Sequence, residues 1–284
     1  MKKAISFLLT IVMALSIAMV NPATVDAATQ YDFSKVTDLG TGKSYTETWT
    51  NKHHKEAYYS FTLKKNGYVS LSITKPEIDG LRSDQRVVIL DKSKKELWVS
   101  NTDKLDGTNS KKTSFKVGLK KGKYYLCIQP LSMTVMSWQS GTTKITLSTK
   151  ANNYYEKEPN NSKKKANTIK VGKTYKGMYC EEYDSSVFVG SAVGDDWYKV
   201  KLKKGKTYKI TLKNYKSLKK GSRTTLVDIT GGKKKSDTAS LGRTLKNKGS
   251  VKIKANKTGY YYIRLWNDGQ HTGVEYSLKV KKVK

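Results

Sequence analysis

A repeated pattern of strand-like segments constrains the fold of this chain more than any other feature of its sequence. Residues 58–73 read YYSFTLKKNGYVSLSI, residues 197–212 read WYKVKLKKGKTYKITL, and the two align without a gap. Each has an aromatic–Tyr pair, an alternating run, a Lys-rich turn and a second alternating run. Order repeated over this length predicts two copies of one fold.

Other segments of the two copies also match. GKSYTETW and GKTYKGMY precede the repeats, SFKVGLKKGKYYLCI and SVKIKANKTGYYYIRL follow them, and the copies end in TKITLS and EYSLKV. We therefore expect one domain over residues 28–150 and a second over residues 151–284, each within the usual size of a single domain.

The apolar residues recur with a period of two. Tyr59, Phe61 and Leu63 alternate with Ser60 and Thr62, which indicates strands with one face in a core and one in water. Turn residues separate these runs, so we predict an all-β protein of two tandem β-sandwich domains with jelly-roll-like connections.

Two details of this reading concern particular residues. The segment 162–169, SKKKANTI, has the only helix-like pattern and is expected to form a turn or a single helical turn. Trp197 and Tyr198 open the alternating run of the second copy, and we expect both rings to fill the core.

The N-terminal residues 1–27 are typical of a secretory signal peptide. Lys2 and Lys3 precede an apolar run from Ala4 to Val20, and Val25-Asp26-Ala27 fits a cleavage site. An uncleaved membrane anchor is the alternative, but Ser and Thr dilute the run and Asn-Pro ends it. We expect a secreted protein without a membrane span after cleavage.

The charge of the chain is strongly positive. Lys and Arg number 55 against 23 Asp and Glu, a formal net charge of +32. Nearly all of the cations are lysines, which suit diffuse attraction to polyanions better than bidentate recognition. A solvated surface that also protects edge strands explains the same lysines without a ligand.

The two cysteines outside the predicted signal peptide are Cys127 and Cys180. They fall in different predicted domains, so a bridge between domains and two free thiols are both open, and a disulfide-stapled scaffold is excluded.

An acidic segment begins the second copy. In YEKEPNNS, Glu156, Glu158 and Asn160 stand two residues apart, so an extended chain places them on one side. Gly-Asp195-Asp196 precedes the next strand of this copy. Carboxylate and amide oxygens are the ligands of Ca²⁺; the alternative is a polar linker followed by a turn.

The order EPNNS…A…I…G…Y.G followed by DDWYKVKLKKGKTYKITL resembles the bacterial pre-peptidase C-terminal domain over residues 154–284, with a diverged copy in residues 30–150. That family is a β-sandwich similar to the collagen-binding domains of collagenases. The resemblance implies Ca²⁺ in the second domain only. The metal ligands carried over by position are Glu156, Glu158, Asn160, Asn161, Asp195 and Asp196. Asn161 stands where the family often has Asp, which lowers the charge of the site.

The first copy departs from this pattern. His53 and His54 stand where the acidic pair would be, and the segment before them lacks the E-x-E-P-N order. Neighbours on a strand point to opposite faces, so the two histidines do not predict a zinc site.

No catalytic motif is visible in the chain. It lacks a G-x-S-x-G elbow and an H-E-x-x-H helix, and His271 in WNDGQHTG fits a hairpin turn better than a Ser/His/Asp set. Glu156 and Glu158 share one side of one segment, which suits a cation better than a glycosidase pair. We expect a non-enzyme.

Binding functions remain. The first is adhesion: a secreted monomer, either free outside the cell or associated with the wall, attaches to an extracellular polymer such as cell wall, polysaccharide or matrix protein. The second is an accessory or targeting module for a separately encoded peptidase. The third is a cationic protein that binds polyanions by charge alone. Specific nucleic-acid recognition is disfavoured, because no groove-reading motif is present.

Overall fold

The computed structural model of the chain describes residues 33–49, 56–78, 81–82, 84–102, 111–130, 141–179, 195–214, 226–230, 239–241, 248–266 and 275–283. The predicted signal peptide, His53, His54, Cys180 and His271 lie outside these residues. Within them, no helix has the length and apolarity that a membrane span needs.

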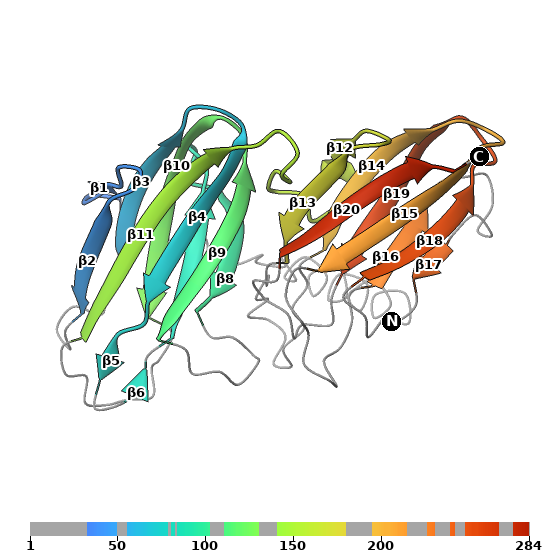
Figure 1. Ribbon diagram of the computed structural model, residues 1–284. Helices are drawn as coiled ribbons and strands as arrows, with labels where there is room; N and C mark the ends of the chain where they lie inside the picture. The colour runs from blue at the N-terminus through green and yellow to red at the C-terminus, as the bar shows by residue number, and fades with distance from the viewer. Residues whose placement is uncertain are drawn as a thin grey trace, which may run out of the picture. The chain divides into compact units, whose positions relative to one another are not determined.

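The first copy is a sandwich of two sheets, drawn face to face in Figure 1. One sheet has the order β1 (Thr37–Asp38), β3 (Ala57–Leu63), β10 (Gly122–Pro130), β7 (Gln85–Leu90), β8 (Glu96–Asn101). The other has the order β2 (Ser44–Trp49), β11 (Gly141–Ala151), β4 (Gly67–Thr74), β9 (Lys112–Leu119). The short hairpin β5 (Glu77–Ile78) and β6 (Leu81–Arg82) extends from one end.

The second copy repeats this order strand for strand. One sheet runs β12 (Asn167–Ile169), β14 (Asp196–Leu202), β19 (Gly259–Trp266), β16 (Leu226–Thr230), β17 (Ala239–Leu241). The other runs β13 (Thr174–Met178), β20 (Glu275–Lys282), β15 (Thr207–Asn214), β18 (Lys248–Lys254).

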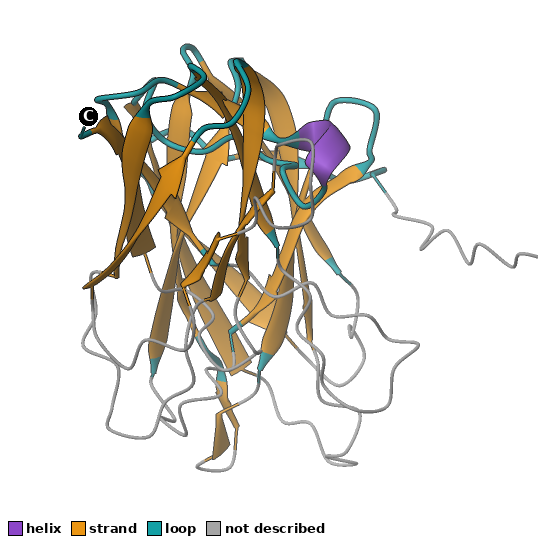
Figure 2. Ribbon diagram, turned by 90° about the vertical axis from the view of Figure 1, so that its right-hand side faces the viewer, coloured by secondary structure: helices purple, strands orange, loops and turns teal. Residues whose placement is uncertain are grey.

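Both copies are jelly rolls. Apart from the first strand of each copy, which pairs in parallel at a sheet edge, all pairs within the two sandwiches are antiparallel and the chain crosses repeatedly from one sheet to the other. Figure 2 shows strands throughout the described residues, with one short helical turn, Lys163–Lys165. The predicted all-β class, tandem sandwiches and jelly-roll connections are therefore confirmed. Within the segment 162–169 the helical turn covers only Lys163–Lys165, and Asn167–Ile169 form β12 instead.

Alternation fills each core from both sheets. Phe61 and Leu63 of β3 are buried while Thr62 between them is exposed, and in β14 Tyr198, Val200 and Leu202 are buried in the same way. The buried apolar side chains form one cluster for each sandwich, with Met178 of β13 joining the cluster of the first. The period of two predicted such alternating burial.

The prediction for Trp197 was wrong. Tyr198 is fully buried, but Trp197 is only half-buried and lies outside the core. Its ring centre is 5.9 Å from the Arg264 guanidinium carbon on the neighbouring strand. Adjacent residues of a strand point to opposite faces, so the two rings cannot both face inward.

Cys127 is a free cysteine in the first sandwich. It is buried, and burial raises the pKa of its thiol well above the ordinary value. A thiol in this state is a weak nucleophile.

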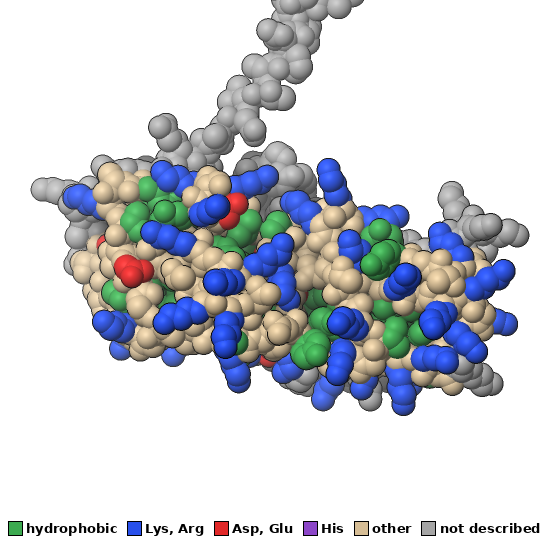
Figure 3. Space-filling view, turned by 90° about the horizontal axis from the view of Figure 1, so that it is seen from above, with side chains coloured by type: hydrophobic (Ala, Val, Ile, Leu, Met, Phe, Trp, Pro, Cys, Tyr) green, Lys and Arg blue, Asp and Glu red, His purple; other side chains and the backbone are tan. Residues whose placement is uncertain are grey.

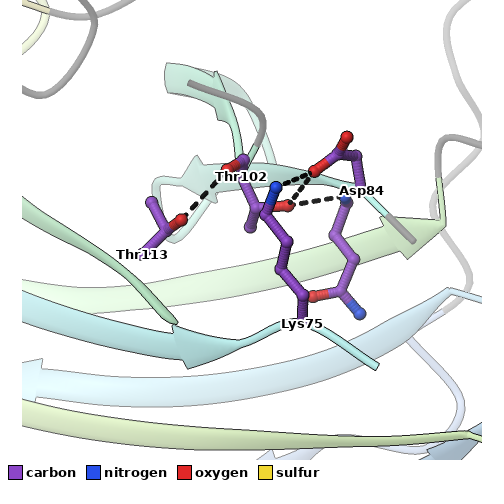
Figure 4. A network of polar contacts seen from close by, with 5 residues as sticks. Lys75, Asp84, Thr102 and Thr113 are labelled. Atoms are coloured by element: carbon purple, nitrogen blue, oxygen red, sulfur yellow. Dashed lines mark hydrogen bonds and ion pairs between the residues drawn. The ribbon is translucent and has the colours of Figure 1, made fainter. Parts of the chain in front are cut away.

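A buried lysine marks one end of the first sandwich. Figure 4 shows the ammonium group of Lys75 against the Asp84 carboxylate, with Thr102 and Thr113 beside them. The Lys75 side chain is 2% exposed and that of Asp84 30%. The Thr102 hydroxyl donates to Asp84 at 3.3 Å, and the Thr113 hydroxyl donates to the Thr102 carbonyl at 3.0 Å.

This asymmetric burial predicts an asymmetric loss of stability. Asp84→Asn should lower the free energy of unfolding by about 2 kcal/mol, because it leaves a buried ammonium without its counter-charge. Lys75→Met should cost less, about 1 kcal/mol, because water can solvate Asp84. Urea unfolding of both variants measures the two values, and a larger loss for Lys75→Met would show that the buried ammonium is not the more dependent partner of this ion pair.

Candidate metal centre

The segment leading into the second sandwich pairs with β13 before it reaches the acidic residues. Tyr155 forms a parallel bridge with Lys176, and the Glu156 N–H donates to the Lys176 carbonyl at 2.9 Å. This pairing positions Glu156. A bend at Glu158 and a cis peptide bond between Glu158 and Pro159 follow it, so the segment is not a regular strand, yet Glu156, Glu158 and Asn160 are all buried.

Asp196 meets these residues from another strand. It is the first residue of β14 and pairs with Leu265 of β19. One carboxylate oxygen from each of Glu156, Glu158 and Asp196 lies within 4.8 Å of the others. The three residues are 1%, 6% and 1% exposed.

Two tyrosine hydroxyls complete the interior of this cluster. The Tyr276 hydroxyl lies 2.6 Å from Asp196 Oδ2, 2.7 Å from Glu156 Oε2 and 2.6 Å from the Tyr198 hydroxyl. The Tyr198 hydroxyl donates to Glu156 Oε2 at 3.1 Å. Each hydroxyl has one proton to donate, so the two tyrosines cannot satisfy all of these short contacts at once.

The Asn160 amide has two chemically distinct orientations. With its nitrogen turned inward, it donates to Glu158 Oε2 at 3.1 Å and to Asp196 Oδ1 at 3.0 Å. An amide oxygen in the same place would face two acceptors, which a cation among them or a proton on one of the carboxyls would make favourable. Backbone bonds hold the residue in place: its N–H donates to Glu158 Oε2, and its carbonyl accepts from the Trp197 N–H.

Burial shifts the protonation of the whole cluster. It raises the pKa of Glu156 to about 7, although Tyr276, the Met178 N–H and Tyr198 donate to that carboxylate. Burial, together with the charges of Glu156 and Glu158, raises the pKa of Asp196 well above its usual range. Carboxylates crowded together in this way cannot all be ionised unless positive charge joins them.

The donor set fits a hard cation. Among the described residues, no lysine or arginine forms an ion pair with Glu156 or Asp196. Three carboxylates, an amide oxygen and nearby hydroxyls are oxygen ligands of the kind that Ca²⁺ takes, and within the described part of the chain no cysteine sulfur or imidazole joins the group. The cluster could therefore hold a metal ion, and Glu156, Glu158, Asp196 and Asn160 are the residues that would hold it.

The other two predicted ligands lie differently. Asp195 is not one of the three clustered carboxylates. It forms an ion pair with Arg264, whose Nε lies 2.7 Å from Asp195 Oδ2. Asn161 is half-buried next to Asn160. Their part in binding a cation stays a prediction.

Several residues of this site were not predicted from the sequence. The Met178 N–H donates to Glu156 Oε1 at 2.7 Å, and Gly177 lies so close to Glu156 and Tyr276 that a β-carbon there would collide with both. Tyr276 was identified only as part of an alternating run. The glycine that interrupts the strand TYKGM was the available signal, since such a glycine often marks a close approach.

The acidic segment also contacts β9 of the first copy. The Glu158 N–H donates to the Gly118 carbonyl at 2.8 Å, and a β-carbon on Gly118 would collide with the Glu156 carbonyl. Nearby, the Lys116 ammonium pairs with Glu275 at 3.0 Å. The backbone of the candidate ligands is thus held from both sides.

The corresponding end of the first sandwich has a different arrangement. There the Tyr59 hydroxyl donates to Glu47 Oε2 at 2.7 Å, and Glu47 comes from β2 itself at the place that Gly177 takes in the second copy. His53 and His54 lie outside the described residues. A cation in the second copy only remains the prediction.

No family model matches this chain, and no curated protein matches it in sequence. Among solved structures, it is similar to the pre-peptidase C-terminal domain of a collagenase from Bacillus anthracis (14% identity, TM-score 0.32), covering 42% of this chain and 99% of that one. CorA, a surface-associated copper-binding protein of Methylomicrobium album BG8, is similar over 40% of this chain and 97% of that one (11% identity, TM-score 0.31).

The CUB1-EGF-CUB2 region of rat MASP-1 is similar over a longer stretch, 86% of this chain and 100% of that one, at 8% identity and a TM-score of 0.25. A domain of the family that the sequence resembles is thus among the structural neighbours. These identities and TM-scores are too low to transfer any property to this chain, so the fold assignment depends on the strand order itself.

Calcium should raise the melting temperature of the chain from Ala28 onward. At calcium about a hundredfold above the Kd, we expect a rise of about 5–10 °C over the chelated protein, because the ion binds the folded state. Differential scanning calorimetry with EDTA and with added calcium measures it. Glu156→Gln and Asp196→Asn should abolish the rise, whereas Glu96→Gln, which removes an exposed carboxylate of the first sandwich, should retain it. An unchanged melting temperature in the parent chain would contradict a structural ion.

Without calcium, stability should decrease as the pH rises through about 7. The pKa of Glu156 is about 7 in the folded protein against an ordinary 4.5, so its protonation stabilises the fold fully below 4.5, and this contribution is lost as the pH passes 7. Calcium should reverse the trend, because ligands bind it deprotonated.

Urea unfolding at pH 5.5 and pH 8, in EDTA and in calcium, tests this dependence. Glu156→Gln is the matched variant and should show a smaller pH effect in EDTA. Equal pH dependence in the parent chain and in Glu156→Gln would show that this carboxyl is not protonated on folding.

Proposed function

We propose that this chain is a secreted, non-catalytic binding protein that attaches to an extracellular polymer, with a second sandwich stabilised by calcium. The acidic cluster supports the structural part of this proposal. Its carboxylates are almost wholly buried, so they cannot reach the backbone of a polymeric substrate, and burial among tyrosines suits a permanently held ion.

The outer face of the second sandwich supports the binding part. Lys199 and Lys201 of β14 lie opposite Tyr262 and Tyr260 of β19, and Lys199 lies 5.7 Å from the Tyr260 ring centre. Tyr260 is 47% exposed. Aromatic rings and ammonium groups that alternate on an exposed sheet form a surface that suits polar polymers, and this face is the observation that carries the proposal.

The distribution of charge agrees with this proposal. Figure 3 shows lysine and arginine side chains spread over the visible face of the described residues, with few acidic ones among them. A surface of this kind attracts acidic polymers and would hold the protein near a wall. An accessory role beside a separately encoded peptidase uses the same surface and is the second candidate.

Co-sedimentation with insoluble polymers tests the proposal. The chain from Ala28 onward should pellet with at least one of bacterial wall, cellulose and collagen at low salt. Protein that stays with the polymer at about 0.5 M salt, where charge is screened within a few ångströms, would indicate a shaped binding site. Protein that is released at this salt concentration would indicate binding by charge attraction alone. Failure to pellet with any of the three would contradict the proposal and favour the accessory role.

A further inference from the structure

A groove with a basic rim lies at one end of the second sandwich. It has a volume of about 480 Å³ and runs between the β12–β13 turn, the β14–β15 turn and the end of β20. Buried Ile169 and Tyr208 form its apolar floor. The Tyr208 hydroxyl accepts a hydrogen bond from the Lys203 N–H at 3.0 Å, which fixes the second turn against the floor.

Lysines form the rim of this groove. They are Lys170, Lys201, Lys203, Lys206 and Lys282. All are exposed, and within the described residues none of them makes an ion pair. No Asp or Glu is among the lining residues. Like charges gathered around one hollow repel one another and create a positive potential that an anion would relieve.

An aromatic ring stands beside these charges. Tyr260 lines the groove and is the large apolar side chain with the greatest exposure among the described residues, at 47%. It pairs across the strands with Lys201. A flat ring next to ammonium groups offers stacking and charge to the same ligand unit.

The first copy supplies an internal comparison. The same place in its sandwich forms a smaller groove of about 330 Å³, lined in part by Thr62, Thr149 and Lys64. By strand register, Thr62 stands where the second copy has Lys201, and Thr149 where it has Lys282. Lys123 takes the place of Tyr260. The jelly roll thus provides the hollow in both copies, while the extra lysines and the exposed ring belong to the second copy alone.

We propose that the groove of the second sandwich is the binding site for an acidic polysaccharide. The lysines face the negative groups of the polymer, the Tyr260 ring packs on a sugar face, and the apolar floor accepts the body of a sugar unit. This inference rests on the proposed function and names its ligand class. A single exposed ring argues against single-stranded nucleic acid, whose sites stack successive bases on several rings.

Binding of defined oligomers tests this site. Hexagalacturonate, titrated calorimetrically into the chain from Ala28 onward at low salt with calcium present, should bind. The uncharged hexasaccharide cellohexaose should bind at least tenfold more weakly. A hexaphosphate chain and a short single-stranded DNA of similar charge should both be weaker than hexagalacturonate, because neither presents a charged sugar face to Tyr260.

Matched variants locate the site. The triple variant Lys201→Gln, Lys206→Gln, Lys282→Gln should lower the affinity for hexagalacturonate by about tenfold or more, because it removes three modest charge contacts. The control triple Lys64→Gln, Lys65→Gln, Lys150→Gln removes the same charge from the groove of the first copy and should change binding less than twofold. Tyr260→Ala should lower the affinity for hexagalacturonate severalfold and leave the affinity for the hexaphosphate unchanged.

Each contrary result overturns the inference. Equal losses in the two triple variants would mean diffuse charge, and unchanged binding in Tyr260→Ala would remove the sugar-stacking role. Hexaphosphate or DNA that binds as tightly as the sugar acid would identify a different ligand. If the groove variants still pellet with a polymer at high salt as the parent does, the groove inference fails while the proposed function stands. These side chains are exposed, and an unchanged melting temperature verifies that the variants fold.

Discussion

The second sandwich depends on one stretch of backbone pairing, that of Tyr155 and Glu156 with β13. It places Glu156 in the interior, where Glu158 and Asn160 of the same segment and Asp196 of β14 are also buried. The same stretch is held on its other side by Gly118 of the first copy. A shift of this pairing by one residue would turn the Glu156 carboxylate away from the Met178 N–H and the Tyr276 hydroxyl, because side chains alternate along paired strands.

The structure separates charges of opposite sign by depth. Carboxylates gather in the interior of the second sandwich with raised pKa values, while ammonium groups cover its exterior. Burying negative charge is costly unless protons or a cation accompany it. Lysines in water cost little and keep edge strands from pairing with other chains. In the function that we propose, the carboxylates act on stability and the lysines on binding, so a change in one group would leave the other intact.

Local patterns in the sequence were sufficient for much of this structure. The gap-free repeat and the period of two predicted two like sandwiches, and the spacing of Glu156, Glu158 and Asn160 predicted their common side. What remained hidden depends on contacts between distant strands. The Tyr276 hydroxyl meets Glu156 from 120 positions away in the sequence, and Asp195 pairs with Arg264. The prediction for Trp197 was wrong for a simpler reason: it assigned the rings of two adjacent residues, Trp197 and Tyr198, to the same face of a strand.

The glycine at position 177 limits how far β13 can change in sequence. A β-carbon there would lie too close to Glu156 Oε2 and to the Tyr276 hydroxyl for any side chain to fit. The first copy has Glu47 at the matching position, and that carboxylate meets the Tyr59 hydroxyl directly. The two sandwiches therefore close the same end of one fold in two different ways, and no single substitution at this position converts one way into the other.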